Sequence, residues 1–200
     1  MSTTAMTGRV AEGSPAFKAR IAGVFYLLTF VTGIYALFVR SRLGFAAGLI
    51  AAACYIVVTL LFYHLFKPVN RNLSLLAAFI SLLGCAIGPL GLFVHAVSRI
   101  NPLVLFGFYC LLVGYLIFKS TFLPRVLGAL MAFAGLGWLT FLSPPLASYL
   151  SPYNIVPGFL GEGALTLWLL VMGLNSQRWE EQNAAGEWRS RHAMERYQDH

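Results

Sequence analysis

Glu162 is the only acidic residue inside an apolar stretch of this chain; every other Asp or Glu lies near a terminus. A carboxylate in hydrocarbon costs roughly 2.5–3.5 kcal/mol on insertion scales, so such a group normally faces protein or water and has a partner. The chemistry open to it is to bind a proton or a cation, or to accept hydrogen bonds. Gly161 and Gly163 flank it, and glycine lets another backbone or a ligand come close.

Four other side chains come at a similar depth, about 6 to 10 Å from the outer ends of their predicted helices at ~1.5 Å of rise per residue. They are Tyr35, His95, Tyr109 and Trp138. One hypothesis is a cavity open to the outside, in which Glu162 binds a cation or proton while the tyrosines and the histidine hydrogen-bond it or a substrate. The alternative is a buried hydrogen-bond cluster beneath the outer aromatic belt, where Tyr and Trp are common in membrane proteins.

Metal, haem and nucleophile chemistry have no matching pattern. His64 and His95 fall at opposite ends of their predicted helices, too far apart to ligate one iron. The sequence contains no Ser-His-Asp set, no Cys-His metal spacing and no glycine-rich phosphate loop. The three cysteines all fall inside apolar runs, where we interpret them as packing residues. We therefore expect no cofactor and no metal.

The composition predicts that a bilayer is the solvent of these groups. The chain is 58% hydrophobic and 10% charged, whereas a soluble domain carries about 25% charged residues. Its apolar stretches are apolar on all sides, as expected where lipid replaces water. The formal net charge of +7 comes from basic residues in ones and twos at the ends of apolar runs. That pattern sets membrane topology and does not indicate nucleic-acid binding.

We predict an all-α integral membrane bundle of six transmembrane helices. The spans are expected at about residues 21–39, 44–66, 73–97, 103–118, 126–142 and 155–174. Within the third span, Gly84, Gly88, Pro89 and Gly91 predict a kink.

Three segments flank or interrupt the spans of the domain, which occupies residues 17–174. Residues 1–16 are small and polar and are expected to be disordered. Residues 143–157 carry four prolines among apolar residues and are expected to form an interfacial loop. Residues 175–200 form a polar tail, expected in the cytoplasm.

The orientation follows from the positive-inside rule. Eleven of the fourteen Lys and Arg residues fall on one side if both termini are cytoplasmic. We therefore expect both termini in the cytoplasm and the protein in the cell (inner) membrane. An inner basic ring consists of Lys67, Arg71, Lys119 and Arg125. We interpret it as a topology determinant, and binding of anionic lipid head groups is the alternative.

Several motifs occur in order along the chain: RIAGVFY at residues 20–26, KPVNR at 67–71, GYLIFKS at 114–120, FLPRVLG at 122–128, and Gly161-Glu162. Together they resemble the bacterial family called domain of unknown function 4386, over about residues 20–174. The resemblance implies a multi-pass membrane protein with no assigned activity. This chain departs from that family's pattern at Tyr109, where histidine often occurs, and in shorter outer connections.

Three functions are considered. The first is a small-solute or proton-linked transporter, indicated by Glu162, the kink in the third span and a weak hairpin repeat between residues 63–67 and 115–119. The second is a non-catalytic membrane module that packs with a partner protein or with copies of itself. A membrane-embedded enzyme is the third. The bilayer is the partner common to all three, and no nucleic acid is expected.

Overall fold

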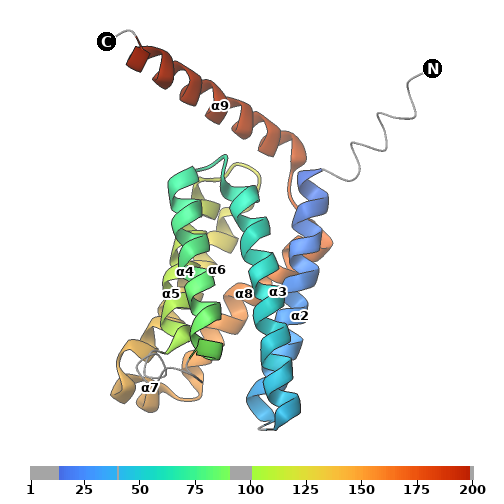
Figure 1. Cartoon of the computed structure of the whole chain (residues 1–200), viewed down its shortest axis with the longest axis vertical. Coiled ribbons are helices and arrows are strands. Elements are labelled where there is room, and N and C mark those ends of the chain that lie inside the picture. Colours follow the sequence, from blue (N-terminus) through green and yellow to red (C-terminus); the bar gives the residue numbers. More distant parts are fainter. Residues whose placement is uncertain (1–13, 40, 91–100, 199–200) are drawn as a thin grey trace, which may run out of the picture.

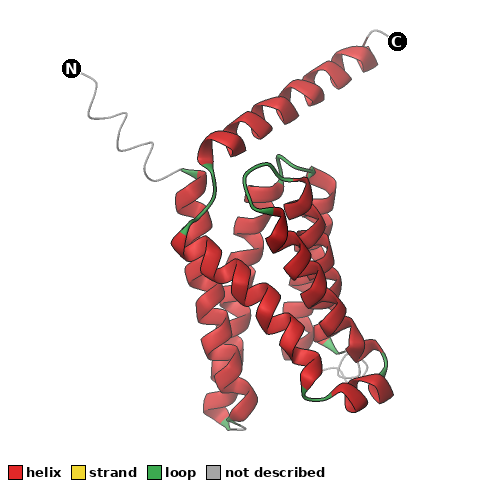
Figure 2. Ribbon diagram, turned by 180° about the vertical axis from the view of Figure 1, so that it is seen from behind, coloured by secondary structure: helices red, strands yellow, loops and turns green. Residues whose placement is uncertain are grey.

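The computed structural model describes residues 14–39, 41–90 and 101–198, and all regular structure in these ranges is helical (Figure 1; Figure 2). Two 3-10 turns, η2 (Thr140–Leu142) and η3 (Tyr153–Ile155), flank α7. The α-helices are α2 (Pro15–Phe38), α3 (Arg42–Phe66), α4 (Arg71–Leu90), α5 (Pro102–Lys119), α6 (Arg125–Leu139), α7 (Pro144–Leu150), α8 (Val156–Val171) and α9 (Ser176–Gln198). The prediction of an all-α chain is confirmed over the described residues.

Six of these helices form a closed ring, in which each packs against the next in the order α2, α3, α4, α5, α6, α8 and back to α2. Residues at the centre of the ring come from separate helices and are fully buried, as shown by the 0% exposure of Tyr26, Val58, Cys110, Met131 and Leu165. Because α8 closes the ring against α2, residues from the two ends of the chain meet in one core.

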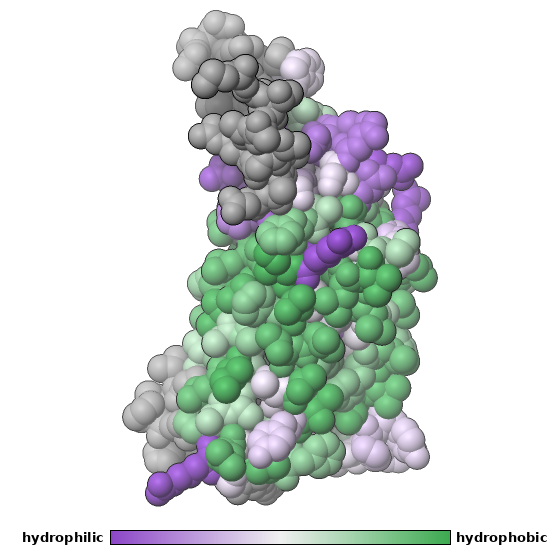
Figure 3. Space-filling view, turned by 90° about the vertical axis from the view of Figure 1, so that its right-hand side faces the viewer, coloured by the Kyte–Doolittle hydropathy of each residue, from purple (hydrophilic) through white to green (hydrophobic). Residues whose placement is uncertain are grey.

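The outside of the ring is apolar, which is consistent with a lipid bilayer around it. Figure 3 shows apolar side chains over the middle of the molecule and hydrophilic ones gathered toward α9. Within the described residues, five segments are long and apolar enough to cross a membrane: Pro15–Ala36, Arg42–Phe66, Pro102–Lys119, Arg125–Leu142 and Tyr153–Val171. The described apolar part of α4 is shorter, Arg71–Ile87. The predicted outer end of that span, beyond residue 90, lies outside the described residues.

The helix termini correct several predicted boundaries. Helix α2 begins at Pro15, well before the predicted residue 21, because Ser14 caps it by accepting a hydrogen bond from the Phe17 backbone at 3.2 Å. Proline at the first helical position has a suitable φ and lacks only a donor that would be unpaired there. The predicted loop at 143–157 instead contains the helix α7, which Pro144 and Pro145 begin in the same way. The chain up to residue 13 lies outside the described part.

Two ends of the ring can be distinguished, one next to α7 and the other next to α9. The predicted inner basic ring lies at the α9 end, since its four residues stand at the adjoining ends of α3, α4, α5 and α6. The predicted polar tail forms α9, whose Trp179 indole donates to the Leu65 carbonyl at 2.8 Å. Gln182 accepts from the Thr121 backbone at 3.1 Å. The later part of α9 slopes away from the ring (Figure 1).

Glycine pairs set the close approach of α5 and α6. A Cβ atom on Gly114 would lie 2.8 Å from the Gly128 carbonyl oxygen, and one on Gly128 would lie 2.8 Å from the Gly114 oxygen. Gly107 and Gly135 repeat the arrangement two turns away. Small residues at such crossings let backbones touch in membranes, where packing replaces the hydrophobic effect.

Candidate functional site

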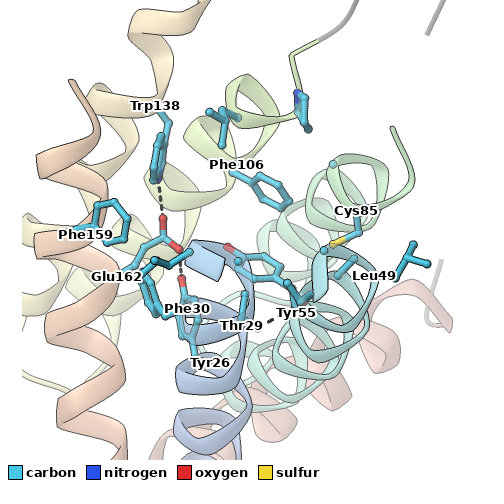
Figure 4. A pocket seen from close by; sticks show the side chains of 18 of the residues that line it. Tyr26, Thr29, Phe30, Leu49, Tyr55, Cys85, Phe106, Trp138, Phe159 and Glu162 are labelled. Atoms are coloured by element: carbon cyan, nitrogen blue, oxygen red, sulfur yellow. Dashed lines mark hydrogen bonds between the residues drawn. The ribbon is translucent and has the colours of Figure 1, made fainter. Parts of the chain in front are cut away.

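The carboxyl of Glu162 is held by two donors from two other helices (Figure 4). The Tyr26 hydroxyl on α2 donates to Oε2 at 2.6 Å, and the Trp138 indole Nε1 on α6 donates to Oε1 at 2.6 Å. Glu162 itself is only 6% exposed. One carboxyl on α8 therefore ties together three helices of the ring.

Two glycines of α8 allow this contact with α6. A Cβ on Gly158 would overlap the six-membered ring of Trp138, and one on Gly161 would overlap the Leu130 carbonyl oxygen. The α8 backbone consequently lies directly on α6, which brings Trp138 within reach of the carboxyl. Gly163 differs, because a Cβ there would meet no atom within 4 Å. Of the two glycines that flank Glu162, only Gly161 is required for packing.

A cluster of tyrosines surrounds the hydrogen-bonded carboxyl. The Tyr55 ring packs edge-on against Tyr26 and Tyr109, with centroid distances of 5.5 and 5.8 Å. The hydroxyls of Tyr55 and Tyr109 are buried and have no hydrogen-bond partner in the described part of the chain. Leaving a buried polar group unpaired costs about 1–3 kcal/mol. Such groups in native proteins call for a partner, which water or a ligand can supply.

A cavity of about 530 Å³ lies beside the carboxyl (Figure 4). Its lining includes residues from the end of α2 and the beginnings of α3 and α5, so it lies in the half of the ring toward α7. Its walls come from α2, α3, α4, α5, α6 and α8, and Glu162, Tyr26, Tyr55 and Trp138 are among its lining residues. No Lys, Arg, His or Asp is among the described residues that line it. Its volume falls within the range of about 300–1,000 Å³ typical of small-ligand sites.

The predicted site residues differ in where they lie relative to Glu162 and the cavity. Glu162 and Trp138 lie together and share a hydrogen bond. Tyr109 is 1% exposed and close to this cluster, yet it makes no hydrogen bond to the carboxyl. Tyr35 lies apart from this cluster, because its side chain is 45% exposed and does not line the cavity. His95 lies outside the described residues.

The position of Tyr35 has a geometric cause. Residue spacing indicates how deep a side chain lies along the membrane normal, but not the direction in which it points. Tyr35 follows Tyr26 by nine residues, which is about two and a half turns of helix. The two side chains therefore leave α2 on opposite faces, and only Tyr26 faces the ring.

Sequence reasoning missed Tyr26 and Tyr55. Tyr26 lies about 21 Å from Arg40 at ~1.5 Å per residue, which is deeper than the roughly 6 to 10 Å expected for the other candidate residues. Helix α8, however, runs obliquely across the ring (Figure 1), so spacing along α8 misjudges the depth of Glu162. The sequence does contain a signal for Tyr26. A tyrosine near the middle of a span must bury its hydroxyl and needs a hydrogen-bond partner there.

The chemistry available is that of one buried carboxyl beside an aromatic cavity. Among the described residues, no group of three or more His, Cys, Asp or Glu side chains could hold a metal ion. Cys54, Cys85 and Cys110 are free and buried, in agreement with the packing role predicted from sequence. The carboxyl can exchange a proton or pair with a cation, and its remaining lone pairs can accept further hydrogen bonds.

Comparison with known proteins supports the sequence resemblance. A model of the family described as "Domain of unknown function (DUF4386)" matches residues 40–100 and 94–173. An uncharacterized protein of Archaeoglobus fulgidus is 29% identical over 127 residues, which cover 59% of this chain and 76% of that protein. No solved structure matches. Since the family model spans most of the helical ring and more than half of the chain, the protein belongs to the DUF4386 family, whose function is unknown.

Proposed function

We propose that this protein is a small-solute transporter in which the cavity beside Glu162 binds the solute and the carboxyl exchanges a proton during the cycle. The cavity carries the proposal, because it is large enough for a small organic molecule and has one ionisable acid on its wall. Buried acids in membrane helices that face a cavity typically belong to substrate or proton pathways.

In this proposal the chain crosses the inner membrane six times, with α2, α3, α4, α5, α6 and α8 as the spans. Both termini are cytoplasmic, which puts the α9 end inside and the α7 end outside. The inner basic ring supports this orientation, since Lys67, Arg71, Lys119 and Arg125 all lie at the α9 end. The cavity then belongs to the outer half of the membrane domain.

The experiment records solute-induced changes of internal pH in proteoliposomes that enclose a pH-sensitive dye, using panels of cationic, neutral and anionic aromatic solutes. The matched variants are Gly33→Leu and Gly163→Leu. Gly33 lines the cavity, and a Cβ there would meet only the Ala51 Cβ at 4.0 Å, so the backbone has room for a side chain, and leucine is chosen to occupy part of the cavity. Gly163 is equally open but does not line the cavity.

We expect at least one solute class to change the internal pH with the wild type and the Gly163→Leu variant, and Gly33→Leu to abolish this change. If no class changes the internal pH with folded wild-type protein, the proposed proton-linked transport is rejected. The same holds if Gly33→Leu leaves the pH change as it is in the wild type.

A second function, docking of a partner protein, is favoured by α9. This helix is hydrophilic and contacts the ring through its first half, near Trp179, while the remainder slopes away (Figure 2). A partner that co-purifies in stoichiometric amount, and whose removal destabilises the protein, would favour docking over transport. Anionic lipid at the inner basic ring is a further proposed contact.

A further inference from the structure

We infer that the cavity beside Glu162 takes lipophilic organic cations, meaning aromatic or alkyl ammonium and phosphonium compounds. This inference rests on the proposed function and names the substrate class of that site. It follows from three observations: the aromatic lining, the sign of the single charge and the apolar character of the cavity mouth.

Aromatic rings make up much of the wall (Figure 4). Five of them form one connected series of contacts, with centroid distances of 5.9, 5.6, 5.5 and 4.9 Å between successive rings of Phe159, Phe30, Tyr26, Tyr55 and Phe106. Ring faces carry negative electrostatic potential and attract cations, most strongly where water is excluded. The seven rings come from five helices and are Tyr26, Phe30, Phe45, Tyr55, Phe106, Trp138 and Phe159.

The charge on the wall selects the sign of the ligand. Glu162 is the only acid or base among the described lining residues, although the whole chain carries a formal net charge of +7. An anion would find no basic partner there and would face both the carboxyl and the ring faces. A cation would meet attraction from both.

The scarcity of oxygen atoms excludes the small inorganic cations. Ca²⁺ takes 6–8 oxygen ligands and Mg²⁺ keeps several waters. The cavity offers one carboxyl, already bound by Tyr26 and Trp138, and a few hydroxyls on an otherwise apolar wall. A large cation with delocalised or shielded charge loses little hydration on entering such a space.

The mouth of the cavity suits a ligand that arrives through the bilayer. Three lining residues are also exposed on the apolar outer surface: Ile34 at 39%, Phe45 at 51% and Leu49 at 42%. These residues lie on α2 and α3, so the cavity extends to the lipid-facing side of the ring. A lipophilic cation that partitions into the membrane can reach Glu162 by this route.

Proton and cation compete for the same carboxyl, so binding should strengthen as pH rises. Around the carboxyl stand Tyr26 of α2, Tyr55 of α3, and Tyr109 and Cys110 of α5, while α6 contributes the indole of Trp138. From α4, the titratable lining residue is Cys85. These groups carry no positive charge, so none of them can replace the bound cation.

The test measures binding of radiolabelled tetraphenylphosphonium to purified wild-type protein in detergent, with neutral triphenylphosphine oxide as the comparison ligand. We expect the phosphonium to bind more tightly than the oxide and its affinity to rise with pH. Glu162→Gln should weaken phosphonium binding roughly tenfold or more, about 1.4 kcal/mol, and remove its pH dependence. Phe106→Leu keeps apolar bulk at the wall, and should weaken phosphonium binding while leaving the oxide unchanged.

Two results overturn the inference. If both ligands bind equally and neither Glu162→Gln nor Phe106→Leu discriminates between them, the cavity takes apolar solutes without regard to charge, and the proposed transport remains. If neither ligand binds folded wild-type protein, the substrate class is wrong, and the internal-pH changes measured with the wild type and the Gly33→Leu variant decide separately whether the cavity serves transport. Should Glu162→Gln fail to fold, Phe106→Leu and the pH series still decide.

Discussion

Gly158 of α8 lies directly against the indole of Trp138, so that a side-chain carbon at position 158 would overlap the ring. The same indole donates its hydrogen bond to Glu162, one turn further along α8. The absence of a side chain at Gly158 thus lets the Trp138 indole lie where it can donate to the Glu162 carboxyl. The geometry of the acid depends on backbone packing between α6 and α8.

Gly158→Ala should displace Trp138 and destabilise the protein by about 1–3 kcal/mol, the usual cost of overpacking. The measurement is unfolding in a denaturing detergent series. Gly163→Ala is the control, because its Cβ would enter open space and alanine favours the helix. Equal stability of the two variants would show that the α6–α8 contact is looser than described.

Gly114→Ala should destabilise the α5–α6 contact by a similar amount, about 1–3 kcal/mol. The new Cβ would meet the Gly128 carbonyl oxygen at 2.8 Å and the Ala132 backbone nitrogen at 3.0 Å. Neither backbone atom can rotate away as a side chain can. Thermal unfolding of Gly114→Ala beside Gly33→Ala tests this, and an unchanged midpoint for Gly114→Ala would contradict it.

Glu162→Gln should fold, whereas Glu162→Leu should be less stable. The indole is a donor only, but a tyrosine hydroxyl can also accept. The Gln oxygen can therefore accept from Trp138 while its amide donates to Tyr26. Leucine leaves both groups unpaired, at a cost on the order of 1 kcal/mol each in a membrane protein. Comparable unfolding midpoints for Gln and Leu would show that these hydrogen bonds contribute little.

Tyr26→Phe and Tyr109→Phe remove one hydroxyl each and form a matched pair. The Tyr26 hydroxyl donates to Glu162 at 2.6 Å, so its loss should cost on the order of 1 kcal/mol. The Tyr109 hydroxyl is buried without a partner in the described residues, so its loss should be neutral or stabilising. A larger cost at Tyr109 would mean that water or a ligand satisfies that hydroxyl.

Single cysteines at Ser148 and Glu180 test the proposed topology. Ser148 lies on α7 and Glu180 on α9, and both side chains are exposed, whereas the three native cysteines are buried. In intact cells, a membrane-impermeant maleimide should label Ser148→Cys and should reach Glu180→Cys only after permeabilisation. Labelling of both from one side would require an odd number of spans and would overturn the six-span proposal.

The sequence identified Glu162 because a charge within an apolar run is visible without any structure. Helix ends were predicted to within a few residues where Lys, Arg, Asn or Pro stands, as at Asn101-Pro102 before α5. The partner Tyr26 could not be found by counting residues, since the site depends on the oblique course of α8 and on the order of helices in the ring. Both arise from contacts between helices, such as that of Gly161 of α8 with Leu130 of α6. The spacing of residues within one helix does not encode such contacts.

The ring closes only when α8 meets α2, and this has a consequence for how the protein is made. Tyr26 enters the membrane with the first span, and its acceptor Glu162 is 136 residues later in the chain. During synthesis the hydroxyl of Tyr26 therefore lacks this acceptor, whether it faces lipid or other helices, until nearly the whole membrane domain has been translated. A chain that ended before α8 would form an incomplete ring, open between α6 and α2. Its cavity would lack both Glu162 and the wall that α8 supplies.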